Sequence, residues 1–316
     1  MTAATNGAAV SPAAVPVPSG GTVFDIGYQR YTGGREGRGR ARRGVFRDGV
    51  RIALGLGRGG RAKVLPWLFI GILSGIGTVM ALVAGAANLM RGDGAAEQMN
   101  LPTHADLYGI ASIVLYVFGA LVAPELLCRD RREGVIQLYL VRPLTGGDYV
   151  AARWAAFLSV MVVAAWLPQI ILFLGLSMGA RDPEAYLRAH WIDIPRFLLA
   201  GVAMASYITS LAMLTASFTT RRAYASIFLV GLFVVSAPFT VGLARELGGT
   251  AGRWMSMFTL TSIPVHVNDI IFGQVSELTD EAPARELSAA IRVGWYLAWT
   301  IVPSVLLWWR YRRMTP

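Results

Sequence analysis

Six long apolar runs constrain the fold of this 316-residue chain more than any other feature of its sequence. Each run is about 20 residues long, which is the length that an α-helix needs to cross the hydrocarbon layer of a membrane. The chain is also 54% hydrophobic and only 15% charged, which is too apolar for a soluble domain of this size. The sequence therefore predicts an all-α integral membrane fold with six transmembrane helices. The runs are 64–90, 107–128, 155–178, 197–218, 224–243 and 291–309.

The basic residues concentrate on alternate loops between these runs. With the amino terminus inside the cell, 21 of the 29 Lys and Arg residues but only 7 of the 19 acidic residues fall on the inner side. Short loops rich in Lys and Arg stay in the cytoplasm, so we expect a multi-pass protein with both termini cytoplasmic. The preference for Arg over Lys is typical of GC-rich bacteria and favours a bacterial plasma (inner) membrane. Because the charge gathers on one membrane face, it indicates no nucleic-acid partner.

Three parts follow one another along the chain. Residues 1–22 are mostly Ala, Pro, Val, Ser and Gly, and such a composition cannot bury a core, so we expect a disordered cytoplasmic tail. Residues 23–63 form a cytoplasmic basic segment, and residues 64–316 form the six-span transmembrane domain. The single cysteine, Cys128, excludes an internal disulfide framework.

The basic segment contains a stretch, Arg42 to Lys63, with the pattern of an amphipathic helix. At helical spacing Phe46 and Val50 fall on one side, while Arg47 and Arg51 fall on the other. The stretch contains too few consecutive apolar residues to cross a membrane. We therefore expect an N-terminal amphipathic elbow helix along the inner membrane surface, with membrane lipids as binding partners.

The connection between the second and third runs predicts a short cytoplasmic helix. Glu133 to Val141 can be helical, and the helix must stop at Arg142 because the residue before a proline, here Pro143, avoids helical geometry. Thr145 and Asp148 then have the spacing of a capping box, which predicts that the third spanning helix begins there. On spacing alone, a positively charged anchor that only fixes the topology explains this stretch equally well.

The same stretch resembles the permease subunits of bacterial type-2 ABC transporters. In that family an acidic residue at the end of the second span is followed by Arg-Glu-Gly, an apolar helix, a basic or small residue with Pro, and a polar turn. The matching residues are Glu125, Arg132-Glu133-Gly134, Val135 to Val141, Arg142-Pro143 and Asp148-Tyr149. The resemblance implies that this segment is a coupling helix which docks on an ATPase subunit. The residues expected at that interface are Glu125, Arg129, Arg131, Arg132, Glu133, Gly134, Val135, Leu138, Arg142 and Pro143.

The resemblance implies that the chain is a permease that exports an unidentified substrate, driven by ATP hydrolysed on other subunits. A nucleotide-binding loop needs a lysine followed by Ser or Thr, and the only lysine, Lys63, is followed by Val64. We therefore expect a chain that is not itself an enzyme and binds no cofactor. ATP and Mg would be bound by separate ABC ATPase subunits, and a second permease chain would complete a homodimer or heterodimer.

Two other functional classes also fit a chain with six spans. A membrane scaffold or assembly factor would use the basic inner face to recruit a cytoplasmic partner without moving anything. An intramembrane serine protease would need a histidine facing Ser177, but His104, His190 and His266 all fall in predicted outer loops. His266 with Asp269 has ligand-like spacing, yet it lacks the further ligands that a metal site needs.

Several smaller features complete the expectations. Gly71 and Gly75 form a small-residue face on which another helix can pack, either in this chain or in a second copy. Glu125 can pair with Arg129 one turn away or hold the coupling segment. Pro238 interrupts the fifth run.

The outer segment 244–290 is apolar enough to predict a short helix at the membrane surface instead of an extended loop.

Overall fold

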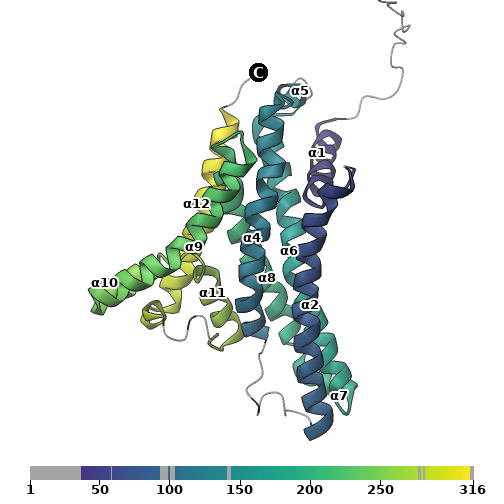
Figure 1. The fold of residues 1–316 in the computed structure, drawn as a ribbon, viewed down its shortest axis with the longest axis vertical. Helices are drawn as coiled ribbons and strands as arrows, with labels where there is room; N and C mark the ends of the chain where they lie inside the picture. The colour runs from purple at the N-terminus through teal and green to yellow at the C-terminus, as the bar shows by residue number, and fades with distance from the viewer. Residues whose placement is uncertain are drawn as a thin grey trace, which may run out of the picture. The chain divides into compact units, whose positions relative to one another are not determined.

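The computed structural model describes residues 37–57, 59–92, 99, 104–140, 144–276, 279 and 282–313. The tail expected at 1–22 and residues 23–36 of the basic segment lie outside the described residues. All described residues belong to one compact unit. The elements, shown in Figure 1, are α1 (Arg38–Ala53), α2 (Gly60–Arg91), α4 (His104–Arg132), α5 (Ile136–Leu140), α6 (Gly146–Gly179), α7 (Pro183–His190), α8 (Asp193–Ser217), α9 (Arg222–Leu247), α10 (Gly249–Ser256), α11 (Ile263–Phe272), the 3₁₀ turn η1 (Pro283–Glu286) and α12 (Ala289–Arg312).

Six of these helices, α2, α4, α6, α8, α9 and α12, are long and apolar enough to cross a membrane. The expected all-α fold with six spans is therefore confirmed. Helix α9 continues through Pro238, so this proline does not interrupt the fifth span. Proline is tolerated inside spanning helices because neighbouring helices and local adjustments satisfy the backbone group that it frees.

The spans form a buried group and a peripheral group. The apolar windows of α4, α6 and α8 are between 50% and 72% buried, whereas those of α2, α9 and α12 are between 17% and 28% buried. Side chains such as Val79, Val234 and Ile301 are large, apolar and more than half exposed. In a membrane these side chains face lipid, so the peripheral spans supply an apolar surface around a packed core.

Small residues allow α2 and α6 to pack backbone to backbone. A Cβ atom added to Gly175 would lie 2.4 Å from the Cβ of Ala81, and one added to Gly179 would lie 2.6 Å from the Cα of Gly85. Around Gly71 and Gly75, in contrast, no described atom lies within 4 Å of such a Cβ. The small-residue contact within the chain thus lies further along α2 than the sequence indicated, and a partner for Gly71 and Gly75 stays a prediction.

The two ends of the helix bundle differ. The start of α1, helix α5 and the end of α12 lie at one end, which we call the α5 end (Figure 1). Helices α7, α10 and α11 lie at the opposite end, which we call the α11 end. Segment 244–290 contains α10, α11 and η1, and α11 packs against α8, α12 and α4. This part of the chain therefore folds against the spans.

Candidate coupling site at the α5 end

A glycine turn sets the direction of α5. Gly134 has a φ of 67°, a left-handed conformation that side chains other than glycine rarely adopt. The Glu133 amide donates to the Arg129 carbonyl at 2.9 Å, and the Val135 amide donates to the Asp130 carbonyl at 3.1 Å. These bonds close the last turn of α4. The chain can then start α5 directly, which is the physical reason for glycine after Arg132-Glu133.

The expected capping box starts α6. The Asp148 amide donates to Oγ1 of Thr145 at 3.2 Å, and the Thr145 amide donates to Oδ2 of Asp148 at 3.1 Å. The same carboxylate accepts hydrogen bonds from two arginines of α1, Arg38 through Nε at 2.7 Å and Arg42 through Nη2. Asp148 therefore caps α6 and also fixes α1 against it.

A buried arginine lies one turn further along α6. The Arg153 side chain is 0% exposed, and its Nη2 atom lies 2.7 Å from Oδ2 of Asp130 and 2.9 Å from Oδ2 of Asp48. The Tyr149 hydroxyl donates to the same Asp130 oxygen at 2.6 Å. A buried guanidinium needs such partners because an uncompensated buried charge is strongly destabilising.

Aromatic rings complete this group and extend it to two more helices. The Arg153 guanidinium lies 5.5 Å from the ring centroid of Tyr149 and 5.9 Å from that of Tyr139 on α5. Tyr311 of α12 stacks on Tyr149 at 6.0 Å between centroids. We call Asp48, Asp130, Tyr139, Tyr149, Arg153 and Tyr311 the Arg153 cluster. Through it α5 is linked to α1, α4, α6 and α12.

The structure places most of the expected interface residues around the turn between α4 and α5. Arg129 Nε lies 3.1 Å from Oε1 of Glu133, and Arg132 Nη2 lies 3.8 Å from the same oxygen. Arg131 donates to the backbone carbonyl of Ser217, at the end of α8. Glu125 accepts a hydrogen bond from Arg222, at the start of α9, so it ties together two spans.

Helix α5 exposes an apolar tip. Ile136 is buried, Val135 is partly buried, and Leu138 is 66% exposed. Leu138 thus extends from α5 largely uncovered by the described residues, next to the charged turn between α4 and α5. Arg142 and Pro143, also expected at the interface, lie outside the described residues.

Comparison with known proteins identifies the family. The family described as ABC-2 family transporter protein matches residues 64–315, most of the chain and every spanning helix. The chain belongs to the ABC-2 transporter family. A search of curated proteins finds no match. The match makes this chain a multi-pass membrane component of a transporter. The matched region begins after α1.

Sequence reasoning missed the centre of this ABC-2 transporter site. Asp130 and Arg153 both lie in the connection between the second and third apolar runs, but the sequence pattern gives neither residue a role at the coupling interface. One signal was present, because Tyr149 and Arg153 are four residues apart and so share a face of α6. The partners Asp48 and Asp130 are distant in sequence, and only the packed helices bring them to Arg153.

At the α11 end of this ABC-2 transporter chain, the described polar residues that the sequence singled out form local or paired contacts. Ser177 donates to the Leu174 carbonyl at 2.8 Å, which is a local helix bond. His104 Nδ1 lies 2.6 Å from Oε1 of Gln169. Asp269 accepts hydrogen bonds from the Ser276 amide and the Thr279 hydroxyl. Over the described part of the chain, no group of three or more potential metal ligands occurs.

Burial changes the ionisation of two groups on α11. Burial raises the pKa of Asp269 above its usual value. Burial, assisted by the positive charge of Arg292, lowers the pKa of His266 to about 4. His266 is therefore neutral at physiological pH, and neither of its ring nitrogens has a hydrogen-bond partner among the described residues.

Proposed function

We propose that this chain is the permease subunit of an ABC transporter in which ATP hydrolysis on separate ATPase subunits moves a substrate outward across a bacterial plasma membrane. Membership of the ABC-2 family supports the permease role. The observation that carries the coupling proposal is the position of α5, which exposes Leu138 on one side and places Tyr139 against Arg153 on the other.

Movement of α5 would reach α4 and α6 through the contacts that Tyr139, Arg153 and Asp130 form with one another. Tyr139 contacts Arg153, which is bonded to Asp130 near the end of α4 and belongs to α6. Separating Arg153 from Asp130 would leave a buried charge unpaired, which is costly, so α4 and α6 would move together at this contact. A push on α5 would therefore tilt α4 and α6 together, which is the motion that alternating access between two membrane faces needs.

Further contacts would carry this motion to two more spans, α8 and α9. Arg131 joins the end of α4 to the end of α8, and Glu125 joins α4 to the start of α9 through Arg222. In the proposed assembly two permease chains, identical or different, enclose the pathway. ATP and Mg²⁺ bind on the ATPase subunits. The α5 end faces the cytoplasm, where basic residues gather in multi-pass proteins.

The test is co-purification of the full chain with the ATPase encoded beside its gene, in mild detergent. We expect the ATPase to bind wild type, and we expect binding or stimulated ATP turnover to be lost in Leu138→Asp and in the Arg132→Ala, Glu133→Ala double variant. Leu187→Asp is the matched control, because Leu187 is also an exposed leucine on a short helix but lies on α7, at the α11 end.

Each result decides between transport and the scaffold alternative. Loss of binding or turnover in the α5 variants, with Leu187→Asp behaving as wild type, supports docking at α5. If no ATPase binds wild type, ATP-driven transport is rejected, and a scaffold that recruits another partner through the basic face takes its place. Equal loss in Leu187→Asp would reject α5 as the specific docking element.

A further inference from the structure

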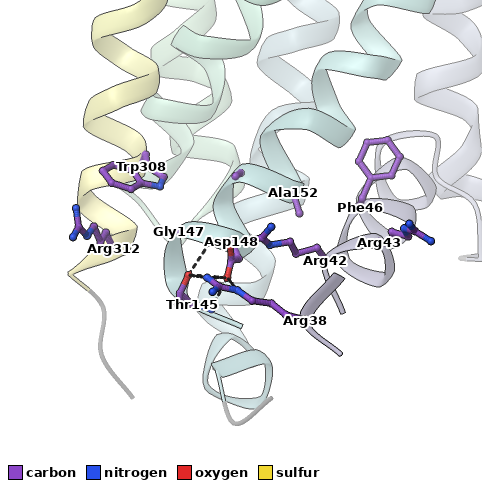
Figure 2. Close-up of a pocket in the computed structure, with 11 residues that line it drawn as sticks. Arg38, Arg42, Arg43, Phe46, Thr145, Gly147, Asp148, Ala152, Trp308 and Arg312 are labelled. Atoms are coloured by element: carbon purple, nitrogen blue, oxygen red, sulfur yellow. Dashed lines mark hydrogen bonds and ion pairs between the residues drawn. The ribbon is translucent and has the colours of Figure 1, made fainter. Parts of the chain in front are cut away.

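A pocket opens beside the Arg153 cluster at the α5 end. It has a volume of about 920 Å³ and is formed by three helices, with α1 on one side, α12 on the other and the first turns of α6 between them (Figure 2). This volume falls within the range of about 300–1,000 Å³ that is typical of small-molecule sites. The lining residues that matter here are Arg38, Arg42 and Arg43 of α1, Asp148 and Ala151 of α6, and Trp308 and Arg312 of α12.

The pocket is strongly positive. Among the residues that the structure describes, four arginines and one carboxylate line it. Asp148 is shared by Arg38 and Arg42, so one negative charge faces two positive ones. Neither Arg43 nor Arg312 forms an ion pair with any residue that the structure describes. Among the described residues the lining therefore carries three more positive charges than negative ones, which suits an anion.

The same pocket has an apolar wall. Phe46, Ala151, Ala152 and Trp308 line it together with the arginines. Trp308 lies close to the backbone of α6, because a Cβ added to Gly147 would be only 2.9 Å from its Nε1 atom. Tryptophan at the end of a spanning helix lies at headgroup depth in a bilayer. An anion that binds here thus has arginines on one side and the start of the hydrocarbon layer on the other.

We propose that this pocket is a binding site for the phosphate headgroup of an anionic phospholipid of the leaflet at the α5 end. Arginine matches phosphate oxygens in geometry and charge, and basic pockets between spanning helices are suited to anionic lipid headgroups. A lipid explains both halves of the pocket, since its headgroup meets arginines of the lining while its acyl chains run over Ala151 and Ala152. An inorganic anion would use only the arginines.

Occupation of the pocket would link two helices that both pack on α6. Arg43 lies on the α1 side of the pocket and Arg312 on the α12 side (Figure 2), so a headgroup in the pocket would neutralise positive charge between these two helices, beside the turn where Asp148 holds α1. The lipid would therefore stabilise the α5 end, whether or not an ATPase docks there.

The experiment measures lipid retention by the full chain with native mass spectrometry during titration with phosphatidylglycerol or phosphatidylcholine. The test variant is Arg43→Gln with Arg312→Gln. The matched control is Arg47→Gln with Arg313→Gln, which removes the same charge from the same two helical segments but lies outside the pocket lining. We expect the test variant to bind phosphatidylglycerol about tenfold more weakly than wild type or more, since each basic residue near an anionic headgroup contributes on the order of 1 kcal/mol.

A second variant fills the pocket without changing its charge. Ala151 is exposed and lines the pocket, so Ala151→Phe leaves the arginines in place and blocks the apolar wall. We expect phosphatidylglycerol binding to fall in this variant as well. Binding equal to that of wild type would overturn the proposal.

Three other outcomes would also overturn it. Equal losses in the test and control double variants would reduce the effect to general surface charge. Thermal stabilisation by inorganic phosphate equal to that by phosphatidylglycerol would assign the arginines to a free anion. Loss of ATPase docking in Arg43→Gln, Arg312→Gln with unchanged lipid binding would assign the pocket to a protein contact.

Discussion

At the scale of single residues, the α5 end depends on a charge that the spans hide from solvent. Arg153 is fully buried, while its partner Asp48 is 47% exposed and Asp130 is almost fully buried. The two carboxylates and the arginine share a small volume with three tyrosine rings. Removing the cation would leave Asp130 buried without its counter-charge, which costs more than the pair itself contributes.

We therefore expect Arg153→Met to destabilise the protein by about 3–5 kcal/mol, the usual cost of breaking a buried pair from one side. The measurement is thermal unfolding of the purified chain in detergent. Arg196→Met is the control, because Arg196 pairs with Asp193 at 3.2 Å while 41% exposed, and such pairs contribute about 0–1 kcal/mol. A melting temperature unchanged in Arg153→Met would contradict a structural role for the cluster.

His266 provides a pH prediction. Its pKa in the folded protein is about 4, below the ordinary value of about 6.5, so the unfolded chain binds a proton first as the pH falls. The stabilising contribution is complete above about pH 6.5 and decreases towards pH 4, by up to about 1.4 kcal/mol per pH unit. Burial raises the pKa of Asp269, so protonation of Asp269 at low pH favours the folded protein, which is opposite to the effect of His266. The variant compared with wild type must therefore keep Asp269.

The comparison is unfolding of wild type and His266→Gln between pH 4 and pH 7. We expect wild type to lose stability relative to His266→Gln as the pH decreases. Parallel curves for wild type and His266→Gln would show that His266 does not titrate as stated.

At the scale of helices, the contact between α2 and α6 gives a test that separates two small-residue faces. Gly175→Leu would drive a side chain into Ala81, 2.4 Å from the new Cβ, and overpacking of this kind costs about 1–3 kcal/mol or more. Gly71→Leu points into open space within the chain, so we expect its thermal stability to match wild type.

The same pair of variants tests the prediction made for Gly71 and Gly75. If Gly71→Leu leaves stability unchanged but lowers the dimer fraction in size-exclusion chromatography, a second copy packs on this face. If both quantities stay as in wild type, the prediction of a helix contact at Gly71 and Gly75 is wrong.

The elements themselves could be predicted from the sequence because their signals are local. The length of the apolar runs determines the six spans, and the spacing of Thr145 and Asp148 determines where α6 begins. The Arg153 cluster could not be predicted in this way. Asp48 is 105 positions before Arg153 in the sequence, and no local pattern records which carboxylate a buried arginine meets once helices pack.

The face of α2 that packs on α6 could not be predicted from local sequence patterns either. Gly71 and Gly75 have the right spacing, and so do Gly77, Ala81 and Gly85 further along α2. Which face meets α6 depends on the rotation of α2 about its axis, and that rotation is determined by all of its contacts at once.

At the scale of the whole molecule, the ends of the bundle predict an orientation that chemical labelling can measure. The single cysteine, Cys128, is buried and donates to the Ala216 carbonyl, so background labelling should be low. We expect a membrane-impermeant maleimide applied to intact cells to label Glu184→Cys, at the α11 end, and to leave Gly37→Cys, just before α1, unlabelled. The reverse pattern would place the α5 end outside and exclude ATPase docking there.

The unequal burial of the spans also has a consequence for the order of events during synthesis. The three most buried spans, α4, α6 and α8, are consecutive spans of the chain. Protein chains emerge from the ribosome amino terminus first, and structure forms as they emerge. The central group can therefore assemble while α9 and α12 are still being translated, and these two late spans then add to a finished core, α12 bringing Tyr311 to Tyr149 last.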